Sequence, residues 1–190
     1  MATNEILIRS DSTPLIFADS TYAPGTNTTL GTRTDDIDVV GLTTGQAREG
    51  VKADLGVDHA AEYDVDLTTE FATDPVSGET IDLYWSRSHS ATAGVGNIGN
   101  TTGADADWAG AVGMTLAESL KAMIFIGSAV LSAQNTADGV PVYTVGRFSP
   151  GAERYGVLVY HNNTSDTMHS DSVECAVRFR PIIPDIQAAV

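Results

Sequence analysis

The chain has 190 residues, of which 42% are hydrophobic and 18% charged, so it can bury a sizeable core within a single domain, residues 1–190. Ten Lys and Arg stand against 25 Asp and Glu, giving a formal net charge of -15 that repels phosphate backbones and anionic lipid headgroups. We therefore expect neither nucleic acid nor a membrane as a partner.

Cys175 is the only cysteine, so no intrachain disulfide can form, and we expect a small buried hydrophobe at that position. The N-terminal residues lack a basic stretch followed by an apolar core, and no apolar run approaches the roughly 20 residues needed to span a bilayer. These features predict a soluble protein made in the cytoplasm.

The first 29 residues form a candidate contact segment, because isolated apolar residues are scattered there among turn formers. These apolar residues are Ile6, Leu7, Ile8, Leu15, Ile16 and Phe17. The alternative is an ordinary edge strand followed by a turn.

Apolar and polar residues alternate with a period of two in the segments that follow, which predicts strands with one solvent-exposed face. It begins at Ile37 and Val39, continues over 51–57, and is clearest over 63–68 and 81–86. Tyr63 and Trp85 fall on the inward faces, so we expect both in the core. Because a turn sequence, Asp74 to Gly78, separates the last two strands, we predict that they pair as an antiparallel hairpin.

Residues 87–113 are rich in Gly, Ala, Asn and Thr and predict a long surface loop. Long loops in compact domains are often functional, so this one is a candidate contact arm. Its candidate contact residues are Asn97, Asn100, Asp105 and Trp108. The glycines of residues 94–99 have the outline of a dinucleotide fingerprint, but no strand or βαβ unit surrounds them.

A short helix is predicted where Thr115 and Glu118 have the spacing of a capping box. The apolar run 122–131 that follows is rich in β-formers, so we expect a strand buried on both faces, with a longer helix as the alternative. Further strands are predicted over 142–148, 155–161 and 173–179. Many short strands with one helix predict an all-β fold, a β-sandwich or jelly roll, or alternatively an open barrel.

No catalytic motif is present in the sequence, and we assign no catalytic, cofactor-binding or metal-binding residues. The four histidines lack the spacing that would place two metal ligands on one element. Asp105 and Asp107 offer oxygen ligands of the kind that calcium prefers, but the glycine and distal glutamate of an EF-hand loop are missing.

The order of features resembles that of β-rich virion structural proteins of tailed bacteriophages, particularly capsid decoration or cement proteins. The resemblance covers most of the chain. It is carried by Ile37 to Val39, Gly50 to Gly56, Gly78 to Ser86, Arg154 to Asn163 and Val177 to Pro184.

This resemblance implies a jelly-roll-like subunit on the outer capsid surface of the virion that binds the major capsid protein of a phage head and stabilises the shell. It implies no catalytic residues. We expect a homotrimer, because lattice-decorating proteins often occupy threefold positions. The alternatives are a carbohydrate-binding or adhesion module of the virion, in which Trp108 could stack on a sugar, and after that a hydrolase.

Overall fold

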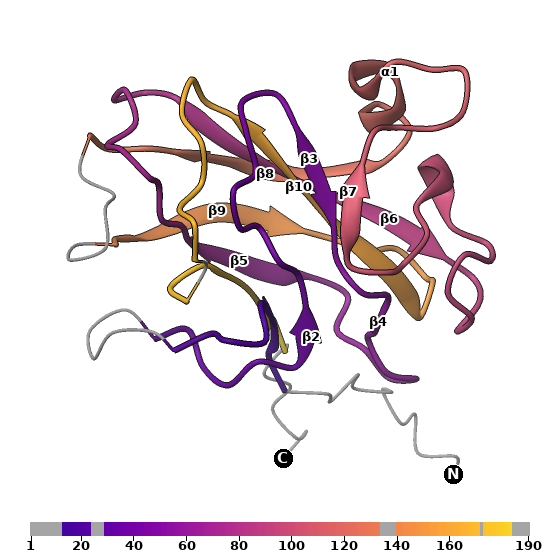
Figure 1. The fold of residues 1–190 in the computed structure, drawn as a ribbon. Helices are drawn as coiled ribbons and strands as arrows, with labels where there is room; N and C mark the ends of the chain where they lie inside the picture. The colour runs from indigo at the N-terminus through magenta and orange to yellow at the C-terminus, as the bar shows by residue number, and fades with distance from the viewer. Residues whose placement is uncertain (1–12, 24–28, 134–139, 172, 184–190) are drawn as a thin grey trace, which may run out of the picture.

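The computed structural model describes residues 13–23, 29–133, 140–171 and 173–183, which form two packed β-sheets (Figure 1). The strands of these residues are β1 (Leu15–Ala18), β2 (Asp35–Asp36), β3 (Ala47–Glu49), β4 (Ala53–Asp54), β5 (Tyr63–Thr68), β6 (Thr80–Ser88), β7 (Ala106–Trp108), β8 (Ile124–Val130), β9 (Val142–Phe148), β10 (Tyr155–Asn163) and β11 (Ala176–Pro181). A 3-10 turn, η1 (Ile98–Asn100), and a helix, α1 (Leu116–Leu120), complete them. The expectation of an all-β sandwich with one short helix is confirmed.

The strand order is that of a jelly roll. One sheet has the order β2-β1-β11-β5-β9, and the other has β7-β3-β10-β6-β8, with β4 beside β10. With β2, β4 and β7 set aside, the remaining strands numbered in chain order read 1-8-3-6 and 2-7-4-5. The pairs β1–β11, β3–β10, β5–β9 and β6–β8 are all antiparallel, as expected when a paired ribbon of chain wraps around a sandwich.

The predicted hairpin between β5 and β6 is wrong, because the two strands belong to opposite sheets. β5 pairs with β11 and β9, whereas β6 pairs with β10 and β8. Alternation identifies the buried face of a strand but not its hydrogen-bonded neighbour. Tyr63 and Trp85 are both buried in one core cluster, as predicted, but they come from different layers.

Five aromatic rings join the two layers at the centre of the sandwich. The ring centroid of Phe179 lies 5.0 Å from Phe17, 5.0 Å from Phe148, 5.5 Å from Trp85 and 6.2 Å from Tyr63. Tilted and edge-on pairs at such distances are favourable beyond the area they bury. Packing of these rings therefore joins the inner faces of the two sheets.

Strand β8 differs in burial from its prediction. A strand forms over 124–130, as expected, but Phe125 is 53% exposed and Val130 is 61% exposed. β8 belongs to an antiparallel sheet that packs against the other sheet through its inner face, and Phe125 and Val130 point to solvent on the other side. The expectation that both faces would be buried is therefore wrong.

The predicted capping box at α1 is confirmed. The Thr115 side chain accepts a hydrogen bond from the backbone N–H of Glu118, and the Glu118 carboxylate accepts one from the N–H of Thr115. The helix is five residues long, and a short turn, residues 121–123, leads from it into β8. None of the helices in the ranges above has the length and apolar character needed to cross a membrane.

Candidate contact surface

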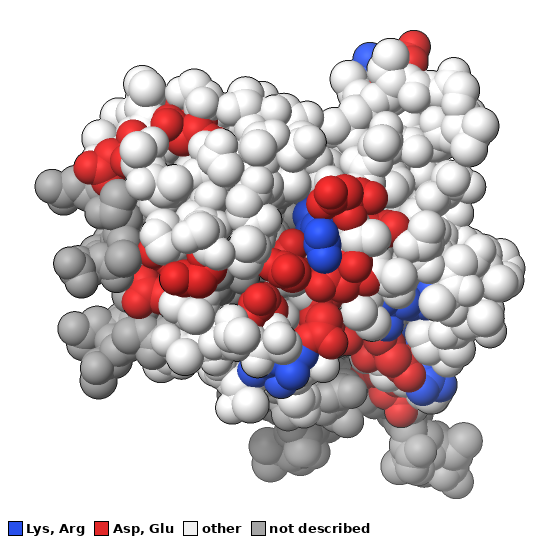
Figure 2. Space-filling view, in the orientation of Figure 1, with Lys and Arg blue, Asp and Glu red and all other residues white. Residues whose placement is uncertain are grey.

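Residues 90–117, which we call the platform, are almost free of charge in a strongly acidic chain. Asp105 and Asp107 are the only charged side chains that the sequence places there, although 18% of the chain is charged. Figure 2 shows acidic side chains gathered across the middle of one face, while the side that carries η1 and α1 in Figure 1 is mainly uncharged. Depletion of charge is typical of the centre of a protein interface.

The charged side chains that hold the platform come from β3 and the residues between β3 and β4. The Nζ atom of Lys52 donates to the backbone oxygens of Ser90 at 3.0 Å, Thr92 at 2.6 Å and Val95 at 2.9 Å. It also contacts the Ser88 hydroxyl at 3.0 Å. Residues 90–95 thus wrap around one ammonium group, and the accompanying desolvation lowers the pKa of Lys52.

Glu49 provides a second attachment. This carboxylate is 1% exposed and accepts hydrogen bonds from the backbone N–H of Thr102, at 2.7 Å, and from its hydroxyl. Burial raises the pKa of Glu49, while these hydrogen bonds oppose the rise. A buried carboxylate with both oxygens hydrogen-bonded fixes the backbone of the platform at Thr102.

Arg48 provides the third attachment and neutralises the two acidic residues of the platform. Its Nε lies 2.7 Å from Asp105 Oδ1, and its Nη1 lies 3.1 Å from Asp107 Oδ1. Asp105 also accepts from the backbone N–H of Asp38 at 3.0 Å. These two carboxylates therefore serve an ion pair and a backbone contact, and the geometry gives no reason to assign them to calcium.

The candidate contact residues of the loop have four different environments. Asn100 is exposed and has a positive φ of 61°. The side-chain amide of Asn97 donates to the backbone oxygen of Thr101. Asp105 is half-buried against Arg48. Trp108 is 5% exposed, so the expectation of an exposed indole is wrong: β7 pairs with β3, and Trp108 packs in a cluster with Ala47, Leu120 and Val159.

The candidate N-terminal contact residues also differ in how far they are exposed. Ile16 is 2% exposed and Phe17 is fully buried, whereas Leu15 is half-buried. β1 lies between β2 and β11, so Ile16 and Phe17 pack inside the domain and are unavailable to a partner, contrary to the expectation. Ile6, Leu7 and Ile8 lie outside the described residues.

Sequence reasoning missed the exposed apolar side chains of the platform. Val112 is 93% exposed, Val95 is 48% exposed and Met114 is 47% exposed. No periodicity marks these residues, because they lie in turns. Their one signal in the sequence is the absence of neighbouring charge.

A groove of about 490 Å³ lies where α1 meets the outer face of β6, β8 and β10. Tyr84 and Phe125 stand there with ring centroids 5.2 Å apart, and Asp82, Lys121 and His161 supply polar groups. Burial acts to raise the pKa of Asp82, but the nearby His161, whose Nδ1 lies 3.9 Å from Asp82, and a hydrogen bond from the Ser128 hydroxyl outweigh it and lower that pKa.

The fold and surface together define the chain as a jelly-roll β-sandwich with a pre-formed, charge-depleted face. No family model matches the chain, and neither a curated protein nor a solved structure matches it.

Proposed function

We propose that the chain is a structural protein of a tailed-bacteriophage virion, a decoration protein that binds the major capsid protein on the outer head surface and stabilises the shell. The observation that carries the proposal is the platform: an almost uncharged face with exposed apolar side chains, held rigid on a jelly roll whose overall charge is -15. The proposal assigns no catalytic residues.

The physical reason is the division of charge over the surface. An acidic exterior keeps the free subunit soluble and keeps subunits apart before assembly. A face without that charge can approach another protein with little electrostatic and desolvation cost. Because Lys52, Glu49 and Arg48 hold the platform in one conformation, little conformational entropy is lost when it docks.

Repetition strengthens such attachment. A capsid presents many equivalent sites, so modest contacts made by linked subunits add up to strong binding. We propose a homotrimer for this reason and because threefold lattice positions would match it. Sedimentation equilibrium of the purified chain tests the oligomer: a trimer mass is expected, and a monomer mass at all concentrations would contradict it.

The function is tested by co-sedimentation of the purified full-length chain with shells of its own phage prepared without it, together with a heat challenge of bare and coated shells. Saturable binding and a higher temperature of shell disruption are expected. Shells that take up no chain, or that take it up without any gain in heat resistance, would contradict the proposal.

One observation favours a second candidate, a carbohydrate-binding module of the virion. The groove beside α1 combines the Tyr84–Phe125 ring pair with Asp82, Lys121 and His161, a set of rings and polar groups suited to a sugar. A glycan array probed with the wild-type chain and a Tyr84→Ala variant would test it. Selective binding that Tyr84→Ala abolishes supports this candidate, and an array without selective binding contradicts it.

A further inference from the structure

A cluster of three ionisable side chains lies at a position where two distant connections of the sandwich meet. Glu70 follows β5, while His169 and Asp171 belong to the connection between β10 and β11. Backbone hydrogen bonds hold the segments together: His169 N–H donates to the Glu70 oxygen at 3.1 Å, and Ala72 N–H donates to the Thr167 oxygen at 3.0 Å. The side chains are therefore placed by the fold.

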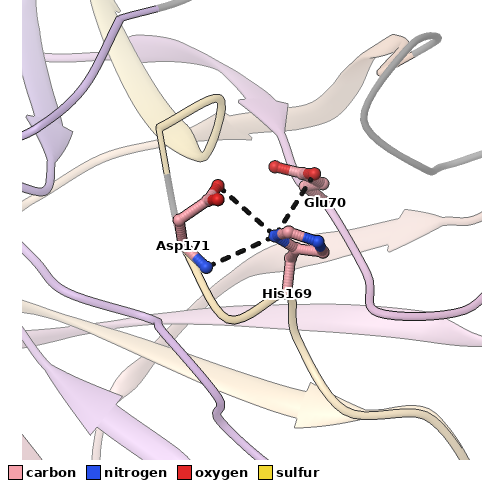
Figure 3. A group of neighbouring side chains, drawn as sticks. All are labelled: Glu70, His169 and Asp171. Atoms are coloured by element: carbon pink, nitrogen blue, oxygen red, sulfur yellow. Dashed lines mark hydrogen bonds and ion pairs between the residues drawn. The ribbon is translucent and has the colours of Figure 1, made fainter.

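The three side chains converge on one point (Figure 3). His169 Nδ1 lies 3.5 Å from Glu70 Oε1 and 3.3 Å from Asp171 Oδ1. One potential ligand atom from each of the three residues lies within 4.8 Å of the others. A carboxylate oxygen and an imidazole nitrogen each offer a lone pair, so three electron-pair donors face the same small volume.

The backbone N–H of Asp171 lies 3.3 Å from His169 Nδ1, the nitrogen that faces both carboxylates. When unprotonated, this nitrogen has a single lone pair, which can serve either this hydrogen bond or a cation. A cation at the point of convergence would take the lone pair in place of the Asp171 N–H and would compensate both carboxylates.

Glu70 is the second and independent observation that points to a cation. Its side chain is 1% exposed, and its Oε2 atom is buried without a hydrogen-bond partner among the residues that the structure describes. An ionised carboxylate that is buried with an unpartnered oxygen is costly unless a positive charge compensates it.

Glu49 shows what a buried glutamate with a purely structural role looks like in this chain. It is also 1% exposed, but its two oxygens accept hydrogen bonds from Thr102. Glu70 instead leaves one oxygen without a partner beside a histidine and a second carboxylate. Glu49 therefore shows that this fold can bury a glutamate and still provide hydrogen bonds to both of its oxygens, which it does not do for Glu70.

We propose that Glu70, His169 and Asp171 bind a divalent transition-metal cation of the Zn²⁺ class. One imidazole nitrogen and two carboxylates suit Zn²⁺ and its neighbours, whereas Ca²⁺ and Mg²⁺ select oxygen ligands. The cation links the connection after β5 to the connection before β11 and so fastens one part of the sandwich. Asp171 has a side chain that is 57% exposed, which gives the cation access from solvent.

The test uses the full-length chain after treatment with a chelator, titrated with Zn²⁺ in a calorimeter and heated with and without Zn²⁺. One Zn²⁺ per chain and a higher melting temperature are expected, because a ligand that binds the folded state stabilises it. Ca²⁺ and Mg²⁺ at the same concentration should give neither effect. Absence of saturable Zn²⁺ binding, or equal binding of Ca²⁺, would overturn the proposal.

Variants separate the cluster from adventitious binding. His169→Gln and Asp171→Asn should each weaken Zn²⁺ binding by at least about tenfold, as expected for loss of a ligand. His89→Gln removes an exposed imidazole outside the cluster and should leave Zn²⁺ binding unchanged. Wild-type affinity in both cluster variants would contradict the site.

Glu70→Gln provides a readout that a merely structural glutamate would not give. Without metal, this variant should melt at a higher temperature than the wild type, because the buried charge is gone. With Zn²⁺, its melting temperature should no longer rise. A metal-free Glu70→Gln chain that is less stable than the wild type and still stabilised by Zn²⁺ would contradict the role of Glu70.

Discussion

The centre of the sandwich and the platform are held together by different forces. In the centre, Phe179 contacts four other aromatic rings drawn from both sheets, and burial of apolar surface supplies the stability. In the platform, Arg48, Glu49 and Lys52 form hydrogen bonds and ion pairs to backbone groups and polar side chains. The difference suggests that the platform can change in sequence or conformation while the sandwich persists.

The largest expected effect concerns the buried thiol beside the centre. Burial raises the pKa of Cys175 to about 12, from a usual value near 9, so its thiolate fraction at pH 8 falls by about a thousandfold. A thiol-specific reagent should leave the folded chain unlabelled at pH 8 and label it completely in denaturant. Rapid labelling without denaturant would show that this part of the core opens easily.

The second effect is a loss of packing at the centre. Phe179→Ala removes the ring shared by both sheets and should lower the free energy of unfolding by about 3–5 kcal/mol. Chemical denaturation measures it. Phe125→Ala serves as the control, because Phe125 is 53% exposed at the edge strand and its removal should cost less than about 1 kcal/mol. An equal loss of unfolding free energy in the two variants would contradict the assignment of Phe179 to the core and of Phe125 to the surface.

The third effect is confined to the platform. Lys52→Met removes the ammonium group around which residues 90–95 wrap and should cost about 1–2 kcal/mol. Hydrogen exchange should increase over residues 90–101, while the amides of β5 and β11 stay protected. An unchanged platform, or exchange that rises equally in both regions, would contradict the separation proposed here.

Alternation and capping rules recovered the longer elements of this fold but not their partners. They missed β3 and β7, and they predicted strands at Ile37 to Val39, where none forms, and over 51–57, where only β4 forms. The predicted strand limits 63–68 and 142–148 match β5 and β9, and the capping box located α1. The pairing of β5 with β11 joins segments more than a hundred residues apart, and a local pattern carries no information about such pairing. The hairpin prediction failed for that reason.

The candidate sites depended even more on long-range contacts. Glu49 and Thr102 are separated by 53 residues, so the hydrogen bonds that turn the loop into a platform leave no local signal. Trp108 is buried because β7 pairs with β3, which the sequence of the loop does not indicate. Likewise, Glu70 meets His169 only through the fold, and the sequence lacks the regular spacing by which metal ligands on one element are recognised.

The central claim is that the platform is the docking face. It is tested most directly by introducing one negative charge at either of two exposed valines, one inside the platform and one outside it. Val112, in the platform, is 93% exposed, and Val57, outside it, is 75% exposed. Val112→Asp and Val57→Asp carry the same change in charge and should leave stability within about 0.5 kcal/mol of the wild type. The measurement is the occupancy of bare phage shells by each variant at equal concentration. Val112→Asp should bind markedly less than the wild type, while Val57→Asp binds normally; normal binding of Val112→Asp, or equal loss in both variants, would contradict the claim.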